Sequence, residues 1–289
     1  MVSESSSEGK VQERKRGTEI GERYDMSFFT ATNISAGYGS KPIVEKLSFS
    51  VDDGCLFGIL GANGSGKTTL LKAVCGILPH VGSCVLDGEM LENMSPRKLA
   101  RYCSYISQRS GISIDISVLD VVLMGFNPWL GLLEHPTAAM KEEGRRALRL
   151  VGLEGKEGNN YLTLSEGQKQ LCILARTLCG KAKLLLLDEP ESALDFRFRY
   201  RMLEILRSWL SDSGKAALVT LHDPYLALNY CDRLLLLSEG KILGTICPKT
   251  DSFGQMEELL DQIYGKISLS RLMDRSGREH IVMLKEASE

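Results

Sequence analysis

The sequence predicts an α/β fold with a mostly parallel sheet, antiparallel β elements near the N-terminus and an inserted α-helical subdomain. Short apolar runs at 55–60, 184–187 and 216–220 have the length and composition of buried parallel strands. Segments with helical spacing alternate with these runs, as expected for helices that cover both faces of a sheet. With 289 residues, 43% hydrophobic and 25% charged, the chain is long enough to bury a full core.

The N-terminal part of the chain changes in character after the first 27 residues. Residues 1–27 are rich in Ser, Glu, Lys, Arg and Gly, so they offer too few apolar groups to offset their ordering entropy and predict a disordered tail. Leu47, Phe49 and Val51 then alternate with serines, as in a half-buried strand. A turn at 52–54 leads into the first buried strand.

A glycine-rich run, GANGSGKTT, follows that strand and opens a predicted helix at 67–76. It fits the pattern GxxxxGK[ST], in which glycines let successive backbone N–H groups turn toward an anion. Lys67 adds a positive charge and Thr68 a hydroxyl for Mg²⁺. A glycine-rich turn without a ligand is the alternative, and the strand-to-helix context argues against it. The candidate nucleotide-binding residues are Gly61, Asn63, Gly64, Ser65, Gly66, Lys67, Thr68 and Thr69.

Two further strands are predicted between this helix and Gln108. A short strand at 83–86 ends in an Asp-Gly turn, and a helix then begins with Ser95 as its cap and Pro96 at its first position. Residues 102–107 have the character of a strand that ends at Gln108.

The next region has a different pattern. Ser117 to Asp120 resembles a capping box that opens a helix at 117–124, and residues 137–151 predict a charged amphipathic helix. We therefore assign about 96–162 to a helical subdomain inserted into the α/β core.

The rest of the chain returns to the α/β pattern. A helix is expected after Ser165, and residues 234–245 predict a hairpin. The main domain then spans 28–245. Residues 246–289 predict a small extension with a helix at 256–264 and a hairpin about Gly277.

Polar groups follow three of the apolar strands. Because functional groups collect at the carboxyl ends of parallel strands, we expect Gly61, the Asp188-Glu189 pair and His222 to meet at one edge. Asp188 would orient Mg²⁺ through water, and Glu189 would polarise an attacking water. His222 would reach a terminal phosphate. The alternatives are a surface turn with two acids and a capping or core histidine.

Six motifs follow one another along the chain: GANGSGKTT, Gln108, LSEGQ at 164–168, LLLLDEP at 184–190, SALD at 192–195 and His222. In this order and spacing they resemble the ATP-binding cassette family over about residues 28–245. The resemblance implies a P-loop NTPase (RecA-like) core, ATP and Mg²⁺ as cofactors, and ATP hydrolysis. Six ordered motifs are far more specific than the phosphate loop alone.

The resemblance implies a role for each matched position. Tyr38 resembles the aromatic residue that stacks on adenine, and Lys67 would contact the β and γ phosphates. Thr68 and Gln108 would bind Mg²⁺, together with Asp188. Glu189 would act as the general base, with Gln108 and His222 as further catalytic residues.

The LSEGQ motif implies a second copy of the chain. In this family it completes the ATP site of the opposite subunit, so Ser165, Gly167 and Gln168 would meet ATP across a two-fold interface. Asp195 resembles the residue that communicates between the two sites. Two positions depart from the family pattern: Glu166 stands where glycine is common, and Glu191 where threonine or serine is more usual.

Three segments narrow the resemblance to ATPase subunits of bacterial importers for iron-siderophore, haem or cobalamin: VLDVVLMGFNPWLGLL, HDPYLALNYCDRLLLLSEGKI and LLDQIYG. This subgroup implies an integral-membrane permease that holds the chain at the cytoplasmic face of the membrane, and an external substrate-binding protein. The candidate permease contacts are Phe126, Trp129, Leu130 and Leu132, unless they fill the core of the subdomain itself. An exporter ATPase and an importer for another nutrient remain alternative functions, because the permease and the binding protein, not this chain, determine which cargo is transported.

Composition and spacing argue against several other classes. A net charge of -2 gives no global attraction to nucleic acid, so we expect no nucleic-acid partner. A cassette protein of translation would normally carry two cassettes, and one of DNA maintenance would need a long coiled coil between 108 and 165. Eight scattered cysteines without a CxxC pair predict reduced, buried thiols in the cytosol, and the four dispersed histidines argue against a zinc site.

Overall fold

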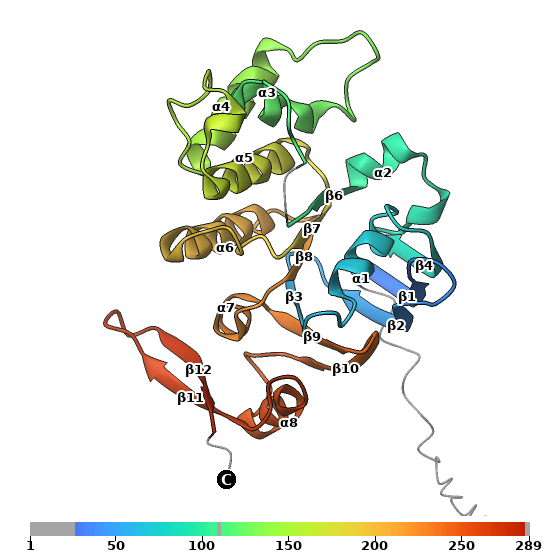
Figure 1. Ribbon diagram of the computed structural model, residues 1–289, viewed down its shortest axis with the longest axis vertical. Coiled ribbons are helices and arrows are strands. Elements are labelled where there is room, and N and C mark those ends of the chain that lie inside the picture. Colours follow the sequence, from blue (N-terminus) through green and yellow to red (C-terminus); the bar gives the residue numbers. More distant parts are fainter. Residues whose placement is uncertain (1–26, 109–110, 287–289) are drawn as a thin grey trace, which may run out of the picture.

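The computed structural model describes residues 27–108 and 111–286. All of the predicted tail except Ser27 lies outside these residues. Within them the chain forms a six-stranded sheet, a four-stranded antiparallel sheet, a group of helices at one end and a helix with a hairpin at the other (Figure 1).

The six-stranded sheet contains the predicted buried strands at its centre. Its order is β10-β9-β3-β8-β7-β6, and every neighbouring pair is parallel except β9 with β10. All residues of β3, β7 and β8 are buried, which explains their unbroken apolar sequences. The strands are β3 (Leu56–Leu60), β6 (Cys103–Ile106), β7 (Leu184–Asp188), β8 (Ala216–Thr220), β9 (Arg233–Ser238) and β10 (Lys241–Ile246).

Alternate residues of the sheet contribute to two cores, one on each face. Leu185 and Leu187 of β7 pack with α5 (Glu166–Cys179), α6 (Phe196–Leu210) and α7 (Pro224–Tyr230). Leu184 and Leu186 pack with α1 (Lys67–Val74) and the antiparallel sheet on the other face. The alternation follows from the two-residue period of a strand.

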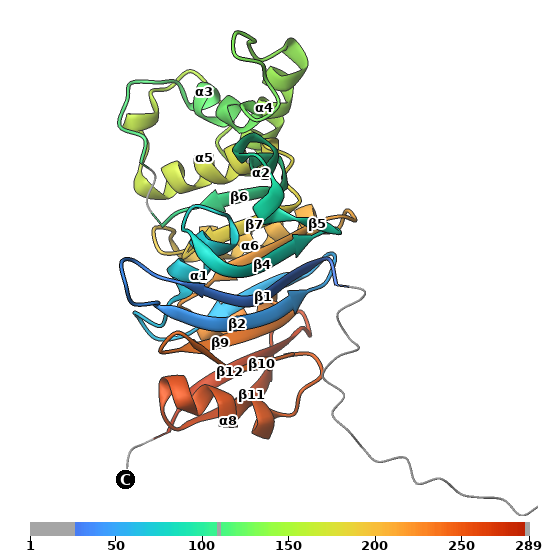
Figure 2. The same ribbon diagram turned by 90° about the vertical axis from the view of Figure 1, so that its right-hand side faces the viewer.

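The antiparallel sheet lies beside α1 and confirms the β elements predicted near the N-terminus (Figure 2). Its order is β2-β1-β4-β5, and a one-turn 3₁₀ helix, η1 (Leu91–Asn93), follows β5. The strands are β1 (Phe29–Ala36), β2 (Val44–Val51), β4 (His80–Leu86) and β5 (Glu89–Met90).

The helical layer differs from the predicted insertion in its boundaries. β6 lies within 96–162 but pairs with β7 in the main sheet, because Cys103 and Ile106 bury their side chains there. The separate helical layer therefore starts after β6, whereas α2 before it packs with the core on the α1 face. Within the layer, α5 packs on α3 and α4 as well as on the sheet. The elements of this region are α2 (Pro96–Tyr102), α3 (Val118–Leu123), η2 (Met124–Phe126), α4 (Ala138–Leu150) and η3 (Tyr161–Thr163).

The C-terminal helix and hairpin are present as expected. They are α8 (Phe253–Tyr264), β11 (Ile267–Met273) and β12 (Glu279–Lys285). Asn229 of α7 joins the hairpin to the core, since its amide donates to Ile281 O and accepts from Ile281 N at 2.8 Å each. Whether 246–289 is a separate domain stays a prediction. Across residues 27–108 and 111–286, no helix combines the length and apolar character that a membrane span requires.

Candidate nucleotide-binding site

The phosphate loop depends on glycine at two positions for different reasons. Gly66 is the N-cap of α1 and has φ 103°, a conformation that side chains disfavour. Gly61 has no such strain, but a Cβ there would lie 2.2 Å from the Leu237 carbonyl oxygen. The sequence therefore permits both the left-handed turn into α1 and the close approach of β3 to β9.

A pocket of about 220 Å³ lies over this loop. Lys67 is buried beside it, and its Nζ donates to Gly61 O at 2.8 Å and Ala62 O at 3.2 Å. Burial lowers the pKa of Lys67, and the neighbouring Glu189 and Asp188 carboxylates oppose this shift. A buried ammonium group beside a helix N-terminus suits an anionic ligand such as phosphate. The described residues that line the pocket are Ile43, Asn63, Gly64, Ser65, Gly66, Lys67, Thr68, Thr69 and Glu189.

Asp188, at the end of β7, gathers three hydroxyl groups around its carboxylate. Oδ1 accepts from Thr68 Oγ1 at 3.0 Å and from Thr220 Oγ1 at 3.1 Å. Oδ2 accepts from the Tyr105 hydroxyl at 3.0 Å. Carboxylate and hydroxyl oxygens are ligands that Mg²⁺ accepts, so Asp188 and Thr68 fit a magnesium site.

Glu189 occupies a strained backbone position between two predicted catalytic side chains. Its Oε1 lies 2.7 Å from His222 Nε2, and its Oε2 accepts from Gln108 Nε2 at 2.7 Å. The residue has φ 50°, which costs a non-glycine residue about 1–2 kcal/mol. The Thr220 hydroxyl helps to hold this conformation by accepting from Glu189 N at 2.8 Å.

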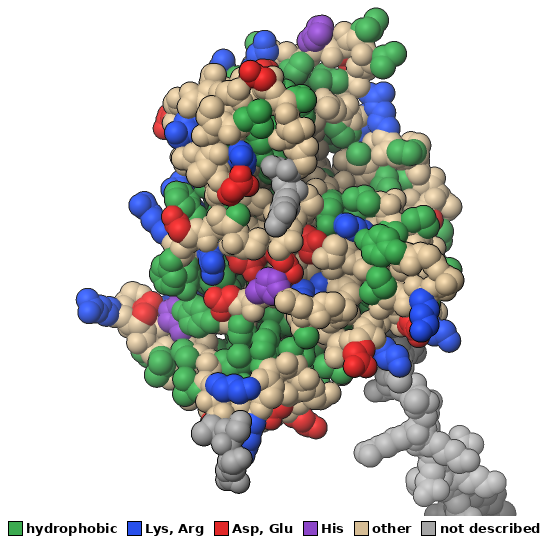
Figure 3. Space-filling model, viewed as in Figure 1, with side chains coloured by type: hydrophobic (Ala, Val, Ile, Leu, Met, Phe, Trp, Pro, Cys, Tyr) green, Lys and Arg blue, Asp and Glu red, His purple; other side chains and the backbone are tan. Residues whose placement is uncertain are grey.

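The predicted meeting of the strand ends is therefore confirmed. The phosphate loop, Asp188, Glu189 and His222 lie at the carboxyl edge of adjacent parallel strands. Acidic side chains gather around a histidine near the middle of the face in Figure 3.

Glu191, the unusual residue after the DEP run, is part of the same network. It is buried, and its Oε1 accepts from the backbone N–H of His222 at 2.9 Å. Its Oε2 has no hydrogen-bond partner among the described residues. Burial raises the pKa of the Glu191 carboxyl. Glu191 thus fixes the backbone at His222.

The predicted signature residues form a separate cluster at the start of α5. Ser165 Oγ accepts from Gln168 N at 3.3 Å, and Gln168 Oε1 accepts from Ser165 N at 3.2 Å, which makes a capping box. Gly167 approaches the loop between β7 and α6 closely, since a Cβ there would lie 3.2 Å from Ala193 O. Among the described residues, Ser165, Gly167 and Gln168 lie outside the set that lines the phosphate pocket.

Tyr38 lies on the loop between β1 and β2 and also stands outside the described lining of that pocket. It is exposed, and its hydroxyl oxygen lies 3.4 Å from Lys72 Nζ of α1. The side chain is therefore accessible to a ligand, with Lys72 Nζ 6.0 Å from the centre of its ring.

Sequence reasoning missed Ile43, Tyr105 and Thr220. The last two carried a signal, because each places a polar group near the end of a buried strand beside a predicted site residue.

The comparisons with known proteins agree with this geometry. The ABC transporter family model matches residues 44–192. The hemin import ATP-binding protein HmuV of Bordetella avium is 35% identical over 226 residues, which cover 75% of this chain and 85% of that protein. The probable iron chelatin transport ATP-binding protein of Helicobacter pylori strain 26695 is 35% identical over 215 residues, which cover 73% of this chain and 83% of that protein.

A solved structure shows the same fold. It is an inward-facing ABC transporter assigned to the metal-chelate type, with a TM-score of 0.75 at 23% identity over 90% of this chain and 98% of that chain. The predicted P-loop NTPase fold is thereby confirmed.

Proposed function

Because the chain belongs to the ABC transporter family, we propose that it is the ATP-hydrolysing subunit of an importer for iron-siderophore, haem or cobalamin. The main support for ATP hydrolysis is that the Glu189 carboxylate contacts both Gln108 and His222 beside the phosphate loop. The cargo class is supported by the names of the hemin and iron chelatin relatives, each 35% identical to this chain.

The residues present fit ATP with Mg²⁺. The phosphates would lie over the N–H groups of the loop and beside Lys67, and the adenine would stack on the open ring of Tyr38. Thr68, Asp188 and Gln108 would hold Mg²⁺. When bound, the metal neutralises charge that develops on the phosphates.

Glu189 is the proposed general base. Its carboxylate accepts the proton of a water aligned with the terminal phosphate, and His222 Nε2 and Gln108 Nε2 hold that carboxylate in place. Lys67 stabilises negative charge on the phosphates. Thr220 and Glu191 position Glu189 and His222 through backbone N–H groups.

A second copy of the chain would complete each site. Ser165, Gly167 and Gln168 lie outside the described lining of their own pocket, which supports a contact with the ATP of a partner across a two-fold interface. Asp195, the proposed link between the sites, caps α6 by accepting from Phe198 N at 3.1 Å. Closure of the dimer on ATP would drive the permease, and hydrolysis would reopen it.

The proposed permease contact needs one correction. Phe126 is 2% exposed and packs in the core of the helical layer, so it is not a surface contact. Leu130 packs partly against the same core, and Trp129 donates its indole N–H to Gly180 O at 2.9 Å while keeping part of its ring exposed. Leu132 is fully exposed at 100%, and its neighbour Leu133 at 88%. We assign the permease contact to Trp129, Leu132 and Leu133, at the cytoplasmic face of the membrane.

Transport in vesicles tests this function. The chain is reconstituted with its permease, with ATP inside the vesicles and cargo with the external binding protein outside. We expect ATP-dependent accumulation of a ferric siderophore, haem or cobalamin, and none with the Glu189→Gln chain. In vesicles preloaded with cargo, ATP-driven movement outward would indicate an exporter, and uptake of a different nutrient would overturn the cargo class.

A further inference from the structure

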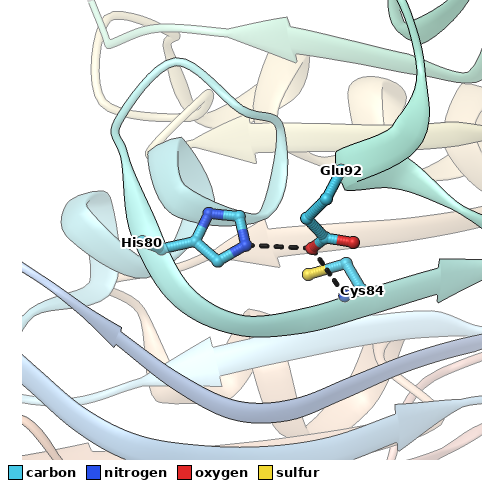
Figure 4. Close-up of side chains that lie close together, drawn as sticks. All are labelled: His80, Cys84 and Glu92. Atoms are coloured by element: carbon cyan, nitrogen blue, oxygen red, sulfur yellow. Dashed lines mark hydrogen bonds and ion pairs between the residues drawn. The ribbon is translucent and has the colours of Figure 1, made fainter.

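A second group of metal-ligating side chains lies away from the nucleotide site, in the antiparallel sheet. His80 and Cys84 lie four residues apart on β4, and Glu92 comes from the neighbouring η1 (Figure 4). Within residues 27–108 and 111–286, this is the only group of three or more His, Cys, Asp or Glu side chains that could hold a metal ion. None of the three lines the phosphate pocket.

The fold explains why a sequence with dispersed histidines and cysteines still forms this cluster. β4 is irregular between His80 and Cys84, because Gly82 has φ 110° and the pairing with β1 shifts register there, and Figure 4 shows both side chains directed toward Glu92. The turn after β4 then returns the chain along β5 and places Glu92 beside them. The prediction that the chain has no zinc site rested only on the spacing of histidines and cysteines along the sequence.

The three side chains already point toward one another. Glu92 Oε1 lies 3.0 Å from His80 Nε2 and accepts from Cys84 N at 2.7 Å. The candidate ligand atoms, including Cys84 Sγ, all lie within 4.8 Å of one another. In Figure 4 the sulfur lies beside the Glu92 carboxylate, on the side that faces the His80 ring.

Burial distinguishes this cluster from an ordinary surface ion pair. Cys84 is 0% exposed, and the side chains of His80 and Glu92 are only 9% and 27% exposed. Burial and the adjacent Glu92 carboxylate raise the pKa of the Cys84 thiol. Metal binding requires the thiolate, so the ion would take the place of the thiol proton and offset the negative charge of the adjacent Glu92 carboxylate.

We propose that His80, Cys84 and Glu92 form a binding site for Zn²⁺ or a similar borderline-soft divalent transition metal. Thiolate, imidazole and carboxylate are the three ligand types that zinc uses, and three protein ligands leave a fourth position for water. Ligand atoms around tetrahedral zinc lie roughly 3.5 Å apart. The candidate atoms lie within 4.8 Å of one another and His80 Nε2 is 3.0 Å from Glu92 Oε1, so binding requires side-chain shifts of only about 1 Å. Cys84 releases its proton to solvent, and His80 binds through Nε2 as a neutral imidazole whose single ring hydrogen is on Nδ1; a second ring proton, where present, also goes to solvent.

A metal ion bound by His80, Cys84 and Glu92 would cross-link β4 to η1, and we call this cross-link the metal clip. An ion that binds only the folded chain stabilises it by mass action. The clip shares no residue with the ATP site, so its presence or absence leaves the proposed ATPase function untouched.

Cobalt substitution tests the site directly. The untagged full-length chain is titrated with Co²⁺, because a cobalt-thiolate bond gives a near-ultraviolet charge-transfer band that oxygen ligands at the nucleotide site do not give. We expect one equivalent of Co²⁺ to produce the band and Zn²⁺ to remove it by displacement. Zn²⁺ alone is expected to raise the melting temperature.

The variants separate this cluster from the other thiols. Cys84→Ser should lose the band, and His80→Asn should weaken Co²⁺ binding by about tenfold or more. Cys247→Ser is the matched control, since Cys247 is the least buried cysteine, and it should keep the wild-type band. Absence of the band in the wild-type chain, or its survival in a folded Cys84→Ser chain, would overturn the proposal.

Discussion

The amino termini of α1 and α5 are both proposed to meet ATP, and they are built in opposite ways. The N-cap of α1 is Gly66, which has no side chain, and the first turn reads KTTL. The N-cap of α5 is Ser165, which takes part in a reciprocal capping box with Gln168. In addition, α5 has an acid in its first turn, Glu166, paired with Lys169 at 2.7 Å.

This difference indicates that the two helix N-termini contribute to ATP binding at different stages. The first-turn N–H groups of α1, with Lys67 beside them, are available to an anion within one chain. At α5 the Ser165 hydroxyl already has an intrahelical partner, and Glu166 adds negative charge. We infer that α1 binds ATP first, and that α5 engages the same nucleotide only when a second copy closes on it.

Replacing Glu189 with Gln should give the largest effect on the α1 side. Loss of the base should lower the hydrolysis rate by about 10² to 10⁴ while ATP still binds, because the amide cannot accept the proton. Single-turnover hydrolysis and nucleotide binding measure the two effects separately. Glu204→Gln on α6 is the control, and hydrolysis at the wild-type rate by Glu189→Gln would exclude Glu189 as the base.

Replacing Lys67 with Ala should weaken ATP binding itself. Loss of a charged hydrogen-bond donor to the phosphates should raise the dissociation constant by about 10- to 100-fold. Equilibrium titration with a fluorescent ATP analogue measures it, with Lys98→Ala as the control because Lys98 pairs with Glu89 on the surface. If Lys67→Ala left the affinity for ATP unchanged, Lys67 at the start of α1 would not be a main contact of the phosphates.

Glu191 gives a pH-dependent effect on stability. Its pKa is raised in the folded chain, so between the ordinary value of about 4.3 and that raised value the folded state binds more protons than the unfolded state. The free energy of unfolding should therefore fall as the pH rises through this window in the wild-type chain, relative to Glu191→Gln.

Urea unfolding of both chains at several pH values measures this difference. The advantage of Glu191→Gln should be largest at neutral pH and vanish near pH 4; growth of the advantage at low pH would contradict the buried carboxylate as its cause. Glu191→Ala should also lower hydrolysis, because it leaves the His222 N–H without its acceptor.

Removing the charge of Glu166 should give the smallest effect, and only on the α5 side. Glu166→Gln should increase the apparent ATP affinity of the dimer by about two- to fivefold at low salt, with less effect at high salt. Binding to a monomeric chain should not change. Equal improvement in monomer and dimer would place Glu166 near the nucleotide of its own chain and break the distinction between the two helix ends.

The sequence predicted the strand ends of this site well, because short, unbroken apolar runs followed by Gly61, Asp188 and His222 are typical of buried parallel strands. The boundary of the helical subdomain was less accurate. β6 has only four residues, two of them half-buried, so its pattern is weak. The His80, Cys84 and Glu92 cluster forms through a turn, and periodicity along the chain does not report such contacts.

A mixed-dimer experiment tests most directly whether each ATP site is shared between two chains. Lys67→Ala inactivates the α1 side and Ser165→Glu the α5 side, so each pure chain should hydrolyse ATP poorly. In a mixed dimer, one site combines the intact α1 of one chain with the intact α5 of the other. Equal mixing with random pairing should restore about a quarter of the wild-type rate. A mixture no more active than the sum of the two pure chains would contradict the shared site.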